Sequence, residues 1–163
     1  MPRLIVFAGL PGTGKSSIAR GVAEATGAVW LRIDTIEQAM ADAPGALDDA
    51  GYRVAYAVAR DNLRLGRDVI GDSVNPWMET RDAWRDAGLA AGAAVIEVEV
   101  VCTDLAEHRR RVERRTVEAP GLTLPTWAEV IGRDYRPWDR DRLVVDTAHV
   151  SLSDSIAQVL AAL

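Results

Sequence analysis

The chain has 163 residues, of which 48% are hydrophobic and 26% are charged, and these proportions are typical of one soluble globular domain. The formal net charge of −5 argues against a surface built mainly for nucleic acid, although a local basic groove is compatible with it. Cys102 is the only cysteine, which excludes an internal disulfide and a multi-cysteine metal cluster. The basic residues are 18 Arg and one Lys, Lys15, and this excludes a protein kinase, whose lysine lies on a later strand.

Short apolar runs alternate with amphipathic stretches along the chain, which predicts a doubly wound α/β sheet. We expect strands at 4–8, 28–33, 68–72, 95–101 and 143–145, and helices at 15–26, 34–41, 52–65, 76–91, 104–117 and 153–162. In the helix at 52–65 the expected buried positions are Val54, Val58 and Leu65. Residues 1–163 are expected to form a single domain. With no signal-peptide pattern and no run of about 18 apolar residues, we expect a cytoplasmic protein without a membrane span.

A glycine-rich loop follows the first expected strand and opens the first helix. Residues 9–16 read Gly-Leu-Pro-Gly-Thr-Gly-Lys-Ser, which matches the phosphate-binding pattern Gly-x-x-x-x-Gly-Lys-Ser/Thr in full. In such a loop the backbone N–H groups surround phosphate oxygens, and the helix N-terminus adds its positive dipole end. We expect Lys15 to reach the β- and γ-phosphates of ATP and the Ser16 hydroxyl to bind Mg²⁺. The nucleotide-binding residues predicted here are Gly9, Gly12, Thr13, Gly14, Lys15, Ser16 and Ser17.

Two aspartates end expected strands, at the edge of the sheet where open α/β folds bind their ligands. Asp34 is expected to orient or deprotonate a substrate hydroxyl, and the alternative is a helix N-cap in a capping box with Glu37. Asp72 is expected to bind Mg²⁺ through water, and the alternative is a plain turn residue. The pair Asp72-Ser73 lacks the second acid of a water-activating ATPase. This favours transfer to a substrate over hydrolysis and disfavours a mechanical ATPase of the AAA type.

The helix expected at 104–117 carries a dense group of arginines, namely Arg109, Arg110, Arg111, Arg114 and Arg115. A solvated face paired with neighbouring glutamates explains each of them singly. For the group, we favour a lid over residues 104–136 that brings cations above a phosphoryl group in transit. Arg110 and Arg114 are the expected catalytic pair. Residues 120–125 are rich in Pro, Gly and Thr, which predicts an exposed hinge or tip of this lid.

Taken in order, these motifs resemble the small P-loop kinases, in particular the group of polynucleotide-kinase-like, zeta-toxin-like and chloramphenicol-phosphotransferase-like proteins. The resemblance covers essentially the whole chain and rests on the loop at 9–16, Asp34, the segment 72–75 followed by Arg81, and the arginine-rich helix. For Asn75 and Arg81, a helix N-cap with a surface ion pair is the alternative. The resemblance implies a three-layer P-loop NTPase fold whose five-stranded parallel sheet has the order 2-3-1-4-5.

The resemblance also implies where the nucleotide base lies. It points to Arg109 or Arg110 on one side and to Asp146-Thr147-Ala148 on the other, so Arg110 and Thr147 are expected contacts of ATP.

Trp127, Tyr135 and Trp138 are expected to anchor a loop to the core, with an acceptor pocket as the alternative.

Residues and resemblance together predict an ATP- and Mg²⁺-dependent phosphotransferase that moves the γ-phosphoryl group to a hydroxyl of a small-molecule acceptor. Two alternatives stay open. One is a kinase of nucleotides or polynucleotides, against which the net charge of −5 speaks. The other is a non-catalytic regulatory protein that binds ATP. A monomer or a homodimer is expected.

Overall fold

A computed structural model describes residues 1–41, 50–116 and 124–163. Within these ranges five parallel strands form one sheet in the order β2-β3-β1-β4-β5. The strands are β1 (Arg3–Ala8), β2 (Val29–Arg32), β3 (Val69–Asp72), β4 (Ala94–Val101) and β5 (Leu143–Asp146). All five expected strands are present, and their order is the one that the resemblance implied. The fold is that of a P-loop NTPase.

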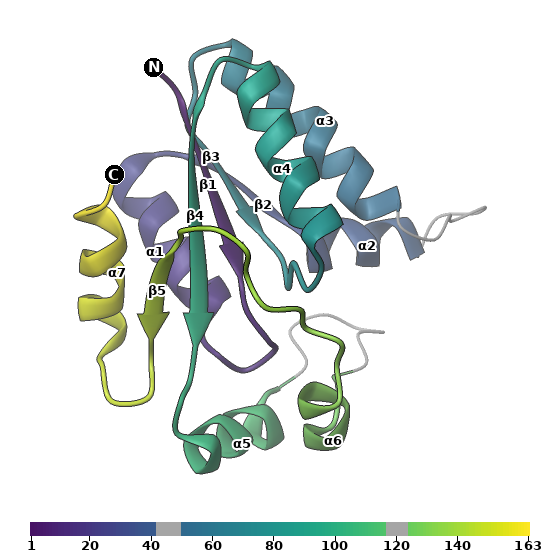
Figure 1. Ribbon diagram of the computed structural model, residues 1–163, viewed down its shortest axis with the longest axis vertical. Coiled ribbons are helices and arrows are strands. Elements are labelled where there is room, and N and C mark those ends of the chain that lie inside the picture. Colours follow the sequence, from purple (N-terminus) through teal and green to yellow (C-terminus); the bar gives the residue numbers. More distant parts are fainter. Residues whose placement is uncertain (42–49, 117–123) are drawn as a thin grey trace.

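Helices cover both faces of the sheet and its carboxyl edge (Figure 1). On one face lie α1 (Lys15–Thr26) and α7 (Leu152–Leu160), and on the other lie α3 (Ala50–Arg64) and α4 (Met78–Ala90), with α2 (Ile33–Ala41) packed against α3. Beyond the strand ends lie α5 (Leu105–Arg114) and α6 (Trp127–Ile131). Helix α6 was not expected, although Thr126 and Glu129 form a capping box at its start.

Strand β1 lies at the centre of the sheet and is buried from Leu4 to Ala8. Its side chains alternate between two hydrophobic cores, as the period of a strand requires. Ile5 and Phe7 pack with α1 and α7, whereas Leu4 and Val6 pack with α3 and with Trp84 of α4. None of the helices in the described ranges combines the length and the apolar character that a membrane crossing requires.

The buried face of α3 differs from the expected one. Val54, Val58 and Leu65 are 42%, 38% and 74% exposed, so the prediction for them is wrong. The face that packs on the sheet and on α4 is instead a row at four-residue spacing, Gly51, Ala55, Ala59 and Leu63. The small residues Gly51, Ala55 and Ala59 let the helix approach closely. Trp84 fills the core at this place, and its ring meets the ring of Tyr56 edge-on, with 4.8 Å between the ring centres.

The segment ahead of β5 is anchored through Arg81. This side chain is completely buried in α4, and its guanidinium carbon lies 4.2 Å from the ring centre of Trp138 and 5.0 Å from that of Tyr135. Trp138 and Tyr135 therefore anchor a loop, as expected. Asn75 is buried as well, and its amide donates to the carbonyl of Phe7 at 2.9 Å. The alternative of an N-cap with a surface ion pair is therefore wrong for Asn75 and Arg81.

Candidate active site

The glycine loop joins β1 to α1 and adopts backbone angles that require glycine. Gly12 and Gly14 have φ angles of +85° and +95°, in the left-handed region. A Cβ at Gly12 would also lie 2.6 Å from the Cγ2 atom of Val112 in α5. The loop is further held by Thr13, whose hydroxyl donates to the carbonyl of Leu10 at 2.9 Å, and by Gly9, whose N–H donates to Val74 at 3.1 Å.

Three cavities surround this loop and share its residues. The loop cavity, of about 210 Å³, is lined by Gly12, Gly14, Lys15, Ser16, Ser17, Arg32, Arg111 and Arg115. The large cavity, of about 640 Å³, shares Lys15 and Arg115 with it. The Thr147 cavity, of about 250 Å³, shares Gly14, Ser17 and Arg111 with it. The loop cavity therefore lies between the other two, and Lys15 lies where it meets the large cavity.

Asp72 and Ser16 come together beside the loop, as the sequence predicted. The Ser16 hydroxyl donates to Oδ1 of Asp72 at 3.1 Å, and the indole N–H of Trp30 donates to Oδ2 at 3.3 Å. Burial raises the pKa of Asp72, and the ammonium of Lys15 opposes this rise. The contact from Trp30 was not predicted from the sequence. It fixes the orientation of the carboxylate.

The oxygens of Ser16 and Asp72 suit Mg²⁺, which prefers hard oxygen ligands and keeps several waters. In the described part of the chain no group of three or more His, Cys, Asp and Glu side chains could hold a metal ion. A cation between Ser16 and Asp72 would therefore need phosphate oxygens and water to complete its shell. This is the usual arrangement in nucleotide-binding sites, and the residues present fit it.

Asp34 lies in the first turn of α2, which begins at Ile33 directly after β2, so Asp34 does not precede the helix as an N-cap residue would. Its carboxylate lines the large cavity. Glu37, one turn further along, lines the same cavity, and its pKa is raised by burial and by the charge of Asp34. The large cavity is also lined by three aromatic side chains, those of Tyr52, Tyr56 and Trp77. The cavity thus combines apolar rings with two carboxylates near Lys15.

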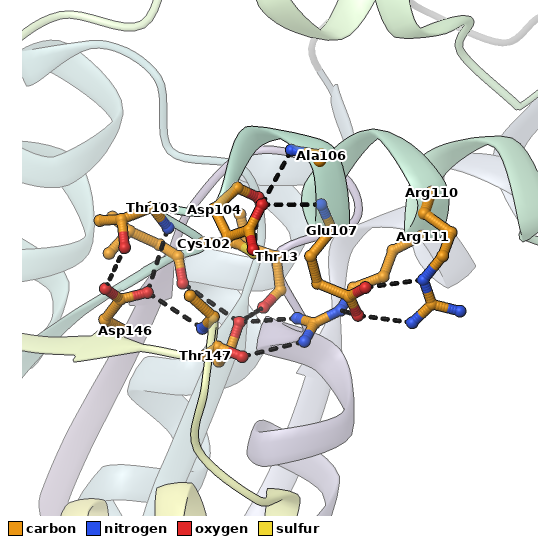
Figure 2. A network of polar contacts seen from close by, with 12 residues as sticks. Thr13, Cys102, Thr103, Asp104, Ala106, Glu107, Arg110, Arg111, Asp146 and Thr147 are labelled. Carbon is orange, nitrogen blue, oxygen red and sulfur yellow. Dashed lines mark hydrogen bonds and ion pairs between the residues drawn. The ribbon is translucent and has the colours of Figure 1, made fainter.

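Helix α5 presents Arg111 to the loop (Figure 2). The two Nη atoms of Arg111 donate to the hydroxyl and the carbonyl of Thr147 at 2.8 and 2.9 Å, and its Nε donates to Glu107 at 2.7 Å. The Thr147 hydroxyl in turn donates to the carbonyl of Thr13 at 2.7 Å. Thr147, expected only from the resemblance, therefore joins the end of β5, the glycine loop and α5.

The two arginines chosen from the sequence lie elsewhere on α5. Arg110 is half exposed and donates twice to Glu107 at 2.6 Å, and Arg114 is exposed. Neither lines any of the three cavities, whereas Arg111 and Arg115 both line the loop cavity, and Arg115 lines the large cavity as well. A role of Arg110 and Arg114 in catalysis stays a prediction. Of the expected lid, residues 117–123 lie outside the described part of the chain, and these include most of the expected hinge.

A periodicity could have identified the correct face of α5. His108, Arg111, Val112 and Arg115 follow one another at spacings of three, one and three residues, which places them on one side of a helix. His108 is buried, and its Nε2–H donates to the carbonyl of Pro11 at 2.8 Å, while Val112 packs beside Gly12. His108 and Val112 therefore anchor α5 to the glycine loop. Arg111 and Arg115 lie on the same side of the helix and so are held near the loop.

Comparison with solved structures confirms the resemblance to small P-loop kinases at the level of the fold. The APS kinase CysC of Mycobacterium tuberculosis, in complex with AMPPNP and APS, has a TM-score of 0.73 at 22% identity, over 98% of this chain and 96% of that chain. A sugar kinase from Janibacter has a TM-score of 0.70 at 18% identity, over 99% and 94%. A gluconokinase from Sinorhizobium meliloti has a TM-score of 0.65 at 22% identity, over 98% and 90%.

Among curated proteins, "Uncharacterized protein Rv2004c" of Mycobacterium tuberculosis is 35% identical over 99 residues, which are 56% of this chain and 20% of that protein. "Uncharacterized protein Mb2027c" of Mycobacterium bovis matches with the same values. The match thus spans about a fifth of the length of these relatives. A family model, AAA_33, described as an AAA domain, matches residues 4–130. This match includes the glycine loop, Asp34, Asp72 and α5, and the chain belongs to the AAA_33 family of AAA domains.

Proposed function

We propose that this protein is an ATP- and Mg²⁺-dependent phosphotransferase that moves the γ-phosphoryl group of ATP to a hydroxyl of a small molecule. One observation carries the proposal: Lys15 lines both the loop cavity and the large cavity, and Asp34 lines the large cavity. A phosphate-binding site and a separate pocket with a carboxylate thus meet at the lysine of a phosphate loop. A protein that only hydrolyses or binds ATP has no need of the second pocket.

The loop cavity takes the phosphates in this proposal. Its backbone N–H groups, the N-terminus of α1 and Lys15 stabilise the charge that develops on the transferred group. Ser16 and Asp72 would hold Mg²⁺, which would neutralise part of the phosphate charge. The Thr147 cavity takes the nucleoside, since it adjoins the loop cavity at Gly14, Ser17 and Arg111. Arg110 and Arg114 stay predicted lid cations.

The large cavity takes the acceptor. Its volume of about 640 Å³ lies within the range of small-molecule sites, which is about 300–1,000 Å³. Asp34 accepts or orients the proton of the acceptor hydroxyl, and the aromatic wall of Tyr52, Tyr56 and Trp77 packs against the body of the acceptor. Three structural relatives named as kinases of APS, gluconate and sugar, together with the net charge of −5, support a small acceptor over a polynucleotide.

The test is transfer of labelled γ-phosphoryl from ATP to a panel of small alcohols, with a 5′-hydroxyl oligonucleotide included. We expect a phosphorylated small molecule. Lys15→Met should lower transfer by about 100-fold or more, because it removes a cation that stabilises the transition state. Lys15 is also the only lysine, so a sample labelled with ¹⁵N-lysine gives one side-chain signal that reports directly on ATP binding.

Arg20→Gln is the matched control. Arg20 lies on α1 like Lys15, but its side chain is 60% exposed and pairs only loosely with Glu24, at 3.7 Å. This variant should transfer at the wild-type rate. Undiminished transfer by Lys15→Met would refute the proposal. ATP hydrolysis without any phosphorylated acceptor would point to an ATPase or a regulatory protein, and a labelled oligonucleotide would make the acceptor a nucleic acid.

A further inference from the structure

Arg32, the last residue of β2, lines the loop cavity and lies next to Asp34, which lines the large cavity. Its side chain is 18% exposed and lines the loop cavity together with the glycine loop. One of its Nη atoms lies 3.9 Å from Oδ2 of Asp34, whose carboxylate lines the large cavity. The Arg32 side chain therefore lies near both the expected position of the phosphates and the carboxylate expected to receive the proton of the acceptor hydroxyl.

The charge of Arg32 acts on the metal-binding pair as well. Strand β2 pairs with β3 in a register that places Arg32 opposite Asp72. Arg32 therefore lies within electrostatic reach of Asp34 and Asp72. A transferred phosphoryl group passes through this space, since it leaves a nucleotide bound at the glycine loop and reaches a hydroxyl beside Asp34.

We propose that Arg32 is a catalytic residue, whose guanidinium contacts the equatorial oxygens of the γ-phosphoryl group during transfer. The inference rests on the proposed function. In the reaction, the acceptor oxygen forms a bond to the γ-phosphorus while the bond from that phosphorus to the bridging oxygen breaks. ADP leaves with the electron pair, and the hydroxyl proton goes to the carboxylate of Asp34. Arg32 stabilises the charge on the group in transit, beside Asp34.

Two features favour Arg32 over Arg111 for this role. Arg111 binds Thr147 at the end of β5, whereas Arg32 lies 3.9 Å from Asp34. Arg32 belongs to a strand of the central sheet, so its backbone is fixed before any ligand binds, and a fixed donor stabilises a transition state without a cost of reorganisation. Arginine also suits this place because its guanidinium stays charged and presents a fork of donors to phosphate oxygens.

The experiment compares wild type, Arg32→Gln, Arg32→Lys and the control Arg20→Gln. Calorimetry measures the binding of ADP with Mg²⁺, with and without aluminium fluoride, which with ADP imitates the phosphoryl group in transit. For Arg32→Gln we expect ADP affinity within about threefold of wild type, and a loss of about 100-fold in the additional affinity that aluminium fluoride confers and in kcat. Arg32→Lys keeps the charge but not the fork, so it should recover part of both losses.

Each outcome of this experiment either supports or overturns the role of Arg32. An equal loss of affinity for ADP alone and for ADP with aluminium fluoride would overturn the inference, because Arg32 would then only bind the ground state. Unchanged aluminium fluoride binding in Arg32→Gln would overturn it as well. Melting temperatures of the variants close to that of wild type exclude an effect of unfolding. Absence of transfer by the wild type would refute the proposed function, whereas the aluminium fluoride measurement needs no acceptor and judges Arg32 separately.

Discussion

Arg81 offers a demanding test of the fold around the large cavity, because its charge is completely buried among backbone carbonyl groups. Its Nε donates to the carbonyl of Asn75 at 2.9 Å, in the loop ahead of α4. Its two Nη atoms donate to Arg136 at 2.9 Å and to Pro137 at 3.2 Å, ahead of β5. Arg81→Met keeps the aliphatic stem and leaves these three acceptors without their donor.

The size of the effect follows from these contacts. A hydrogen bond from a charged donor is worth about 1.5–3 kcal/mol, and a desolvated cation–π contact such as that with Trp138 adds up to about 2 kcal/mol. Burial of the guanidinium offsets part of this gain, since the charge leaves water on folding. We expect Arg81→Met to lower the free energy of unfolding by about 3–5 kcal/mol.

Urea unfolding followed by circular dichroism measures this loss. Such a loss is a large part of the usual stability of about 5–15 kcal/mol, so the unfolding transition should move to a clearly lower urea concentration. Arg85→Met is the control, one turn further along α4. The side chain of Arg85 is 45% exposed and lies 3.7 Å from Glu97, so its removal should cost about 1 kcal/mol or less. Equal losses in the two variants would refute the reasoning.

Two further predictions concern the glycine loop and the pH dependence of stability. Gly12 and Gly27 both have positive φ angles, but nothing lies within 4 Å of a Cβ at Gly27, whereas one at Gly12 would meet α5 at 2.6 Å. Calorimetry should therefore find ADP binding weakened by about tenfold or more in Gly12→Ala and unchanged in Gly27→Ala, and equal affinities would contradict this. Burial acts to raise the pKa of Asp68, but hydrogen bonds from Arg3 bring it below its ordinary value of 3.8. A pKa that is lower in the folded state stabilises the protein above pH 3.8, and this contribution is lost as the pH falls through the folded-state pKa. Asp68→Asn should therefore lower the free energy of unfolding at pH 7. Urea titrations should find that its difference from wild type shrinks below pH 3.8, and a constant difference would be inconsistent with this role.

Features that depend on neighbours along the chain were predictable from the sequence. The apolar run of β1, the glycine loop and α1 are consecutive, and each requires only backbone angles and a local pattern of side chains. Asp34 and Asp72 were found because parallel strands bring their carboxyl ends to one edge of the sheet. Lys15 was the most clearly predicted site residue, because it is the only lysine and the last residue but one of a complete phosphate loop.

What the sequence by itself determined is therefore the class of fold, the phosphate loop and the two aspartates at the strand ends. Only the tertiary structure decided which face of α3 is buried, that Arg111 rather than Arg110 meets the loop, and that Arg32 and Lys15 line one cavity. The physical reason is that a local pattern sets the conformation of an element but not its rotation against its neighbours. That rotation follows from side chains distant in sequence, such as Trp84 against α3 and His108 against the glycine loop.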